Sequence, residues 1–216
     1  MVDVKEQNDI FGLIGRKLKR KIECFVIGGS AMMYYNVKEN TKDIDIVFLN
    51  EKDRTEIENI LRKEDFTERN TRFLYHRKKN VPILLQKYDM RFDLFLRDII
   101  CFWLSDEMIE RVEKVYEFGD LIVKVVSLED IVLLKCATER AGDRADVKEI
   151  IEKVGIKWDV ITEEVVRQTK DREIFSVFLY DFLMELKEDL KVDIPKEVIK
   201  KVRTIGEREM VKRLGK

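Results

Sequence analysis

The chain has 216 residues, enough for one ordinary domain or for one domain with a small helical appendage. Charged residues make up 39%, but the formal net charge is only −1. The overall charge therefore gives no signal for or against a nucleic-acid partner. Three isolated cysteines argue against a disulfide framework and a thiolate zinc site. The chain lacks both an apolar run of about 18 residues and a signal-peptide pattern, which predicts a cytoplasmic protein with no membrane partner. The charge-rich composition, with only two prolines, is typical of thermophile proteins.

Hydrophobic periodicity predicts an alternation of helices and strands over the first half of the chain. The expected helices cover residues 4–21, about 30–36 and 51–63, and the expected strands cover 23–27, 43–49, 72–76, 83–87, 90–96, 112–118 and 121–126. A turn pair, Gly119-Asp120, separates the last two runs and predicts a hairpin.

From Ser127 onward the pattern is helical, and the hydroxyl and acidic residues of Ser127–Asp130 indicate a helix start. We therefore predict an α+β fold in which a mixed β-sheet flanked by helices is followed by a C-terminal all-helical part. The expected domains are residues 1–126 and 127–216. Alternatively, the first helices of the second part pack on the core of the first.

A glycine pair follows the strand expected at 23–27. Gly28 and Gly29 would let the backbone turn sharply and come close to a ligand. The next helix would begin near Ser30, whose hydroxyl suits an N-cap, and its free N–H groups would form an anion site. This stretch predicts a phosphate-binding turn.

Two carboxylates follow the glycine turn closely. Alternation along DIDIVF places Asp43 and Asp45 on one face of a strand and the apolar residues on the other. Side by side at ~4 Å, two carboxylates repel by about 1 kcal/mol in water and by more where solvent is scarce. A fully wet face or a cation between the acids would relieve this repulsion. Mg²⁺ prefers oxygen ligands and often bridges to substrate phosphates.

A third carboxylate, Asp93, lies within the apolar run 90–96. An isolated acid in a buried strand is costly unless it is paired, so we expect Asp93 to face Asp43 and Asp45 across the sheet. Three carboxylates could then hold two metal ions ~4 Å apart, as in phosphoryl chemistry. The alternatives are that Asp93 lies on the wet face of an edge strand, or that Asp89, which we read as a turn residue, is the third acid.

Two segments carry local positive charge. Residues 16–21 read RKLKRK, and residues 191–216 hold nine Lys or Arg against four Asp or Glu. Either segment could track a phosphate backbone, although charge runs more often mark a solvated helix face or a basic tail.

Together these motifs resemble the minimal nucleotidyltransferase superfamily of the DNA polymerase β type. The resemblance rests on GGS, twelve further residues, DIDIVF and a later hydrophobic–Asp–hydrophobic strand. Within this superfamily, the chain is similar to the toxin-like proteins of the AbiE system and the aminoglycoside nucleotidyltransferases of bacteria and archaea. Their Lys-bearing helix and R-x-x-D-x-x-D segment are similar to Lys135 followed by Arg140, Asp143 and Asp146.

The resemblance implies roles for the matching residues. Asp43, Asp45 and Asp93 would be the catalytic acids and would bind Mg²⁺, as two ions, or Mn²⁺ in its place. Asp93 would also act as general base toward the acceptor hydroxyl. The nucleotide-binding residues would be Gly28, Gly29, Ser30, Lys42 and Lys135.

Some of these roles stay open. Lys135 could equally be a surface residue, and Arg140 could form an ion-pair network with Asp143 or Asp146 that fastens the helices. We favour that structural role for Asp146. The chain also departs from its relatives, because Glu39-Asn40 stands where they carry a basic residue, with Lys38 and Lys42 nearby.

The resulting hypothesis is a Mg²⁺-dependent nucleotidyltransferase. It would move an NMP from an NTP to a hydroxyl acceptor and release pyrophosphate. The acceptor would be an RNA end such as that of tRNA, a protein or a small molecule, and a toxin role would imply an antitoxin as partner. The alternative is a catalytically inactive nucleotide- or RNA-binding module with the same fold.

Overall fold

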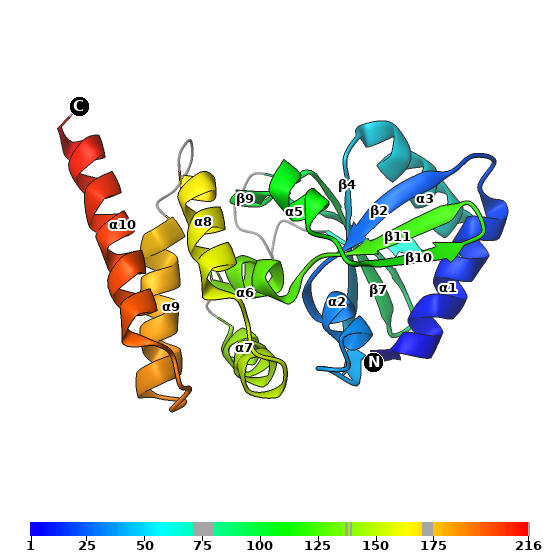
Figure 1. Cartoon of the computed structure of the whole chain (residues 1–216). Coiled ribbons are helices and arrows are strands. Elements are labelled where there is room, and N and C mark those ends of the chain that lie inside the picture. Colours follow the sequence, from blue (N-terminus) through cyan, green and yellow to red (C-terminus); the bar gives the residue numbers. More distant parts are fainter. Residues whose placement is uncertain (71–79, 137, 139, 170–174, 216) are drawn as a thin grey trace. The chain divides into compact units, whose positions relative to one another are not determined.

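The computed structural model describes residues 1–70, 80–136, 138, 140–169 and 175–215 (Figure 1). The chain divides into two compact units, Met1–Ser127 and Leu128–Lys216. The strand expected at residues 72–76 lies outside the described residues.

The first unit contains a seven-stranded mixed sheet with the order β10-β11-β2-β4-β7-β6-β5. Its strands are β2 (Ile22–Val26), β4 (Asp43–Phe48), β5 (Thr67–Glu68), β6 (Ile83–Lys87), β7 (Met90–Leu96), β10 (Lys114–Phe118) and β11 (Leu121–Val125). β11 pairs with β2 and β4 with β7 in parallel, and the other neighbours are antiparallel. Two short ladders accompany the sheet: β1 (Val2–Asp3) with β3 (Asn40–Thr41), and β8 (Asp98–Ile99) with β9 (Phe102–Trp103).

The helices of this unit are α1 (Val4–Lys17), α2 (Gly28–Tyr34), α3 (Glu51–Lys63) and α5 (Asp106–Glu110). α1 contacts β10 and β11, and α3 contacts β4, β6 and β7. A capping box opens α1, because Glu6 N donates to Asp3 Oδ1 at 2.8 Å and Asp3 N donates to Glu6 Oε2 at 3.1 Å. α3 begins after Asn50, whose side chain accepts from Asp53 N.

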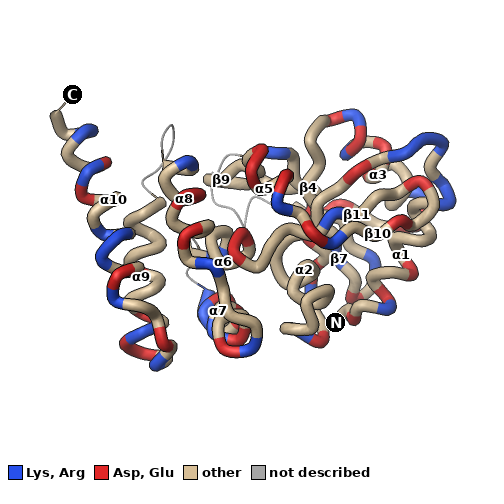
Figure 2. The backbone as a smooth tube through the Cα atoms, in the orientation of Figure 1, with Lys and Arg blue, Asp and Glu red and all other residues tan. Residues whose placement is uncertain are grey.

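The second unit is built of helices α6 (Leu128–Cys136), α7 (Ala141–Lys153), α8 (Trp158–Thr169), α9 (Phe175–Glu188) and α10 (Lys196–Leu214). α9 contacts each of the other four, and it carries the fully buried residues Leu179, Phe182 and Leu183. Basic residues outnumber acidic ones along α10 (Figure 2). Among the described residues, none of the helices has both the length and the hydropathy that a membrane crossing requires.

The structure confirms the predicted fold class, a mixed sheet flanked by helices and followed by C-terminal helices. The helix at 51–63 and the strands at 83–87 and 90–96 have the predicted bounds, and β10 and β11 form the expected hairpin. The two-residue strands and the short helix α5 were not predicted, because so few residues show no period.

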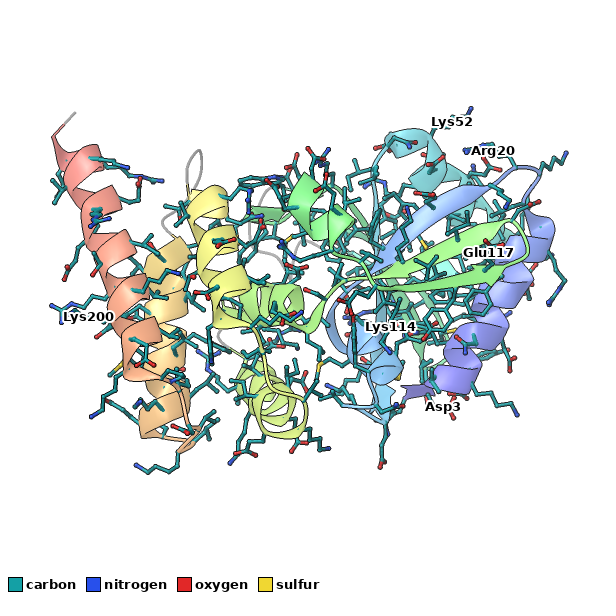
Figure 3. All side chains as sticks on the ribbon, in the orientation of Figure 1. Asp3, Arg20, Lys52, Lys114, Glu117 and Lys200 are labelled. Carbon is teal, nitrogen blue, oxygen red and sulfur yellow. The ribbon has the colours of Figure 1, made fainter. Side chains whose placement is uncertain are left out.

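The expected helix 4–21 was too long. The backbone turns to an extended conformation at Leu18, with ψ at 152°, so the basic segment 16–21 lies largely outside the helix. Part of that segment is paired with acids of α3. Arg20 contacts Asp53 at 2.7 Å and Glu56 at 2.8 Å, and Figure 3 shows Arg20 on the α3 side of the unit.

Candidate active site

Asp43 and Asp45 lie on one face of β4, as the alternation predicted. Both are partly exposed, whereas Ile44 between them and Ile46 after Asp45 are buried. The strand therefore presents two carboxylates on one side and core residues on the other.

Asp93 lies on β7, the parallel neighbour of β4, and its backbone is in register with that of Asp45. The strand pairing thus gives the expected adjacency of the three acids. β7 lies between β4 and β6 in the sheet, and Asp93 is only 3% exposed, so the wet-edge alternative was wrong. Asp89 is an exposed residue in the turn before β7, as expected.

The glycine turn lies directly against the acids. Gly28 has φ at +61°, a conformation that L side chains rarely adopt. A Cβ at this position would lie 2.6 Å from Asp45 Oδ2. Position 28 therefore requires glycine for two reasons, the backbone conformation and the space that Asp45 leaves. The backbone is also tied to β4, since Ile27 N donates to Asp45 O at 3.1 Å.

Ser30 does not cap the next helix, and that expectation was wrong. α2 begins at Gly28 after Ile27, so Ser30 lies within its first turn and is fully buried. Its hydroxyl donates to Asp43 O at 2.9 Å and accepts from Asp45 N at 3.2 Å. Ser30 thus fixes the backbone that carries both acids, and its contact with a triphosphate stays a prediction.

Arg91 is the site residue to which the sequence analysis gave no role. Its register partner is Asp43, and its guanidinium bridges two acids: Nη2 lies 2.5 Å from Asp43 Oδ2 and Nε lies 2.9 Å from Asp93 Oδ1. Burial lowers the pKa of Arg91, but the charges of Asp93 and Asp43 outweigh burial and hold the pKa above its ordinary value. The signal was present in the sequence, because Arg91 and Asp93 are two residues apart and share a strand face. We call Asp43, Asp45, Asp93 and Arg91 the acid cluster.

The basic residues near the glycine turn differ in position. A Cβ at Gly29 would lie 2.6 Å from Thr41 Oγ1 and 3.7 Å from Lys38 Cδ, so the stem of Lys38 passes the second glycine of the turn. Lys42, the residue that the sequence analysis assigned to the nucleotide, is exposed. Lys38, directly before the departure at Glu39-Asn40, therefore lies beside the glycine turn.

Lys135 belongs to a separate cluster within the helical unit. It is 7% exposed, and its Nζ lies 2.5 Å from Asp143 Oδ1 and 2.8 Å from Asp146 Oδ2. Arg140 Nε contacts Asp143 Oδ2 at 2.9 Å. Burial raises the pKa of Asp143, but Lys135, Thr138 and Arg140 together outweigh this effect and the pKa lies below its ordinary value. We call Lys135, Arg140, Asp143 and Asp146 the Lys135 cluster. It is the local ion-pair network that the sequence analysis gave as an alternative. Lys135 itself is buried, so the alternative that it is a surface residue was wrong.

The acid cluster has the chemistry that a hard divalent cation requires. Three carboxylates supply oxygen donors, and with Arg91 they leave a formal charge of −2. Asp43 keeps 21% of its side chain exposed, so the cluster is open to solvent on that side. Within the parts of the chain that the structure describes, no three acidic, His or Cys side chains are already gathered around a metal position. Arg91 occupies oxygens of two of the acids instead.

Comparisons with known proteins identify the family to which the chain belongs. One similar structure is the aminoglycoside nucleotidyltransferase ANT(2'')-Ia in complex with adenylyl-2''-tobramycin, with 15% identity, a TM-score of 0.46, and coverage of 83% of this chain and 98% of the other. Another is a candidate nucleotidyltransferase from H. pylori, with 12% identity, a TM-score of 0.43, and coverage of 96% and 93%. At these scores neither likeness carries the assignment, and no curated protein matches the sequence. A family model described as nucleotidyltransferase of unknown function matches residues 7–187. The chain therefore belongs to this nucleotidyltransferase family, DUF6036.

Proposed function

We propose that the protein transfers a nucleoside monophosphate from an NTP to a hydroxyl acceptor and releases pyrophosphate, with a divalent cation held by Asp43, Asp45 and Asp93. The observation that carries the proposal is the contact between Gly28 and Asp45, together with the pairing of Asp45 and Asp93. One small region thus combines a backbone that a phosphate can approach closely with three oxygen ligands.

The chain's own residues would mainly position the substrates and neutralise the charge of the triphosphate. When bound, Mg²⁺ or Mn²⁺, as one or two ions, would offset the triphosphate charge and polarise the reacting phosphorus. Gly28 and Gly29 would admit the phosphates, and Lys38 would contact them beside Gly29. Asp93, which is in register with Asp45 on the neighbouring strand, would accept the proton of the acceptor hydroxyl.

For the acceptor we propose an RNA end, and a groove in the helical unit supports this choice. The groove measures about 730 Å³ and lies between α8 and α10. Its basic lining residues are Arg167, Lys200, Lys201 and Arg208, against Glu163 and Glu197. Lys201 contacts Asp159 and Arg167 contacts Glu164, whereas Lys200 (Figure 3) and Arg208 make no ion pair with any described residue. The lining contains no aromatic side chain, so RNA would be held by its phosphates and binding would weaken with salt.

A toxin role with an antitoxin partner, and action in the cytoplasm, belong to the same proposal. The toxin role and the antitoxin partner rest on the resemblance described above.

The test compares the wild type with Asp43→Asn/Asp45→Asn. Thermal unfolding would be followed with each NTP, with and without Mg²⁺, and pyrophosphate release would be measured with total RNA as acceptor. Ligand at 100 times its dissociation constant stabilises a fold by about 2.7 kcal/mol, so a Mg²⁺-dependent shift in the wild type should be readable and absent from the variant. NTP binding without pyrophosphate release, over RNA, protein and small-molecule acceptors, would instead favour the inactive binding module.

A further inference from the structure

Arg91 binds the same carboxylate oxygens that the proposed metal ion would need. Its guanidinium reaches Asp43 Oδ2 through Nη2 and Asp93 through both Nε and Nη2, the latter at 3.5 Å from Oδ2. The side chain of Arg91 is 28% exposed, so the guanidinium has solvent on one side into which it can move.

The burial of Asp93 explains why a cation is needed there at all. Its side chain is 4% exposed, and an ionised carboxylate at that depth costs several kcal/mol unless a positive charge lies next to it. Arg91 supplies that charge from two residues away on the same strand face. Before any ligand arrives, Arg91 is therefore the cation that lies beside this buried carboxylate.

A divalent cation and a guanidinium cannot share these oxygens without repulsion. The cluster carries three negative charges and one positive charge, so a cation that binds beside Arg91 meets a like charge at contact distance. We propose that Arg91 acts as an internal counter-ion that a divalent cation must displace from Asp43. This inference rests on the proposed function for the metal, and it adds a positioning residue that sets the metal affinity.

The experiment measures Mn²⁺ affinity of the full nucleotide-free chain, by electron paramagnetic resonance of the unbound ion. Arg91→Met removes the charge and keeps most of the volume, whereas Arg91→Lys keeps the charge. We expect Arg91→Met to bind Mn²⁺ at least about tenfold more tightly than the wild type, because a like charge has left the site. Arg91→Lys should stay close to the wild type.

Arg97→Met is the matched control. Arg97 directly follows β7, and its guanidinium contacts Asp106 at 2.6 Å and Leu104 O at 2.8 Å, away from the three acids. Its removal should leave the Mn²⁺ affinity unchanged. Equal or weaker Mn²⁺ binding by Arg91→Met than by the wild type would overturn the inference while leaving the proposed function intact. Failure of every variant to bind Mn²⁺, even with NTP, would overturn both.

A second measurement on the wild type does not depend on the stability of Arg91→Met. In ¹⁵N-arginine-labelled protein, the Nε–H signal of Arg91 can be assigned from its absence in Arg91→Lys. Saturating Mg²⁺ should shift this signal, because the guanidinium leaves Asp43. An unmoved signal at a Mg²⁺ concentration that occupies the site would contradict the displacement.

Discussion

The acid cluster and the Lys135 cluster use the same residue types with different charge balance. The acid cluster sets three carboxylates against one guanidinium, whereas the Lys135 cluster sets Asp143 and Asp146 against Lys135 and Arg140. The first is left with a formal charge of −2 and the second is neutral. Both clusters have a buried part, because the side chains of Lys135 and Asp143 are 9% and 6% exposed and that of Asp93 is 4% exposed. Asp43 of the acid cluster, however, keeps 21% of its side chain exposed.

We propose that this difference separates a binding site from a structural one. A neutral network with a buried core has satisfied its own charges and has little free energy to offer a ligand. An excess of negative charge beside a glycine turn is costly to the protein alone, and a cation or a metal–nucleotide complex relieves it. Substitutions in the two clusters test that contrast.

Asp93→Asn should cut NMP transfer about 10³-fold or more, because it removes both a metal ligand and the proposed base. Asp89→Asn, which changes the exposed acid of the turn before β7, should leave the rate unchanged. The rates of pyrophosphate release by the two variants decide the point. A similar loss of rate in both variants, or a loss in neither, would mean that Asp93 takes no part in the reaction.

Lys135→Met should act on stability rather than on chemistry. It leaves Asp143 and Asp146 without their shared cation, and breaking a buried pair in this way typically costs about 3–5 kcal/mol. The control is Lys153→Met, which removes an exposed i,i+4 contact with Glu149 and should cost at most about 0.5 kcal/mol. Urea unfolding gives both values.

The folded Lys135→Met protein should still bind NTP with wild-type affinity. Weaker NTP binding without a loss of stability would instead support the nucleotide-binding role first assigned to Lys135.

The sequence was sufficient for the elements with long, regular patterns and for the acid pair. The adjacency of Asp93 and Asp45 followed from one energetic argument, the cost of an unpaired acid in a buried strand. The order of the remaining strands could not be obtained this way. β11 pairs with β2 across about a hundred residues of chain, and both strands are apolar enough to fit several positions in a sheet.

The residues whose roles were not predicted are those that contact other segments of the chain, because such contacts form only in the folded structure. Arg91 stood in the right register, but only the fold brings its guanidinium to Asp43 on another strand. Ser30 was expected to face a ligand, and its hydroxyl instead bonds to the backbone of β4. Lys38 passes Gly29 because the chain between α2 and β3 turns back, which no local pattern reveals.

Replacing each of the two lysines before β4 should have a smaller effect, on NTP affinity. It distinguishes the role of Lys38 from that of Lys42. Lys38→Ala should weaken NTP binding about tenfold, as expected for a lost contact with a charged group, whereas Lys42→Ala should change it by less than about twofold. Isothermal titration with Mg²⁺ and a non-hydrolysable NTP measures both affinities. The reverse order would restore Lys42 as the phosphate-binding residue and assign Lys38 to the fold.

The smallest expected effect is a pH dependence within the Lys135 cluster. Because the pKa of Asp143 in the folded protein lies below its ordinary value, the carboxylate contributes stability above the unfolded pKa of about 3.9. That contribution is lost as the pH falls toward and through the folded-state pKa, since both states are then protonated. Asp143→Asn lacks the charge at every pH, so it should be less stable than the wild type at pH 7. The two unfolding free energies should converge as the pH falls below about 4. A difference that persists at low pH would mean that Asp143 stabilises through its hydrogen bond from Thr138 rather than through its charge, and the contrast between the two clusters would then lose its electrostatic basis.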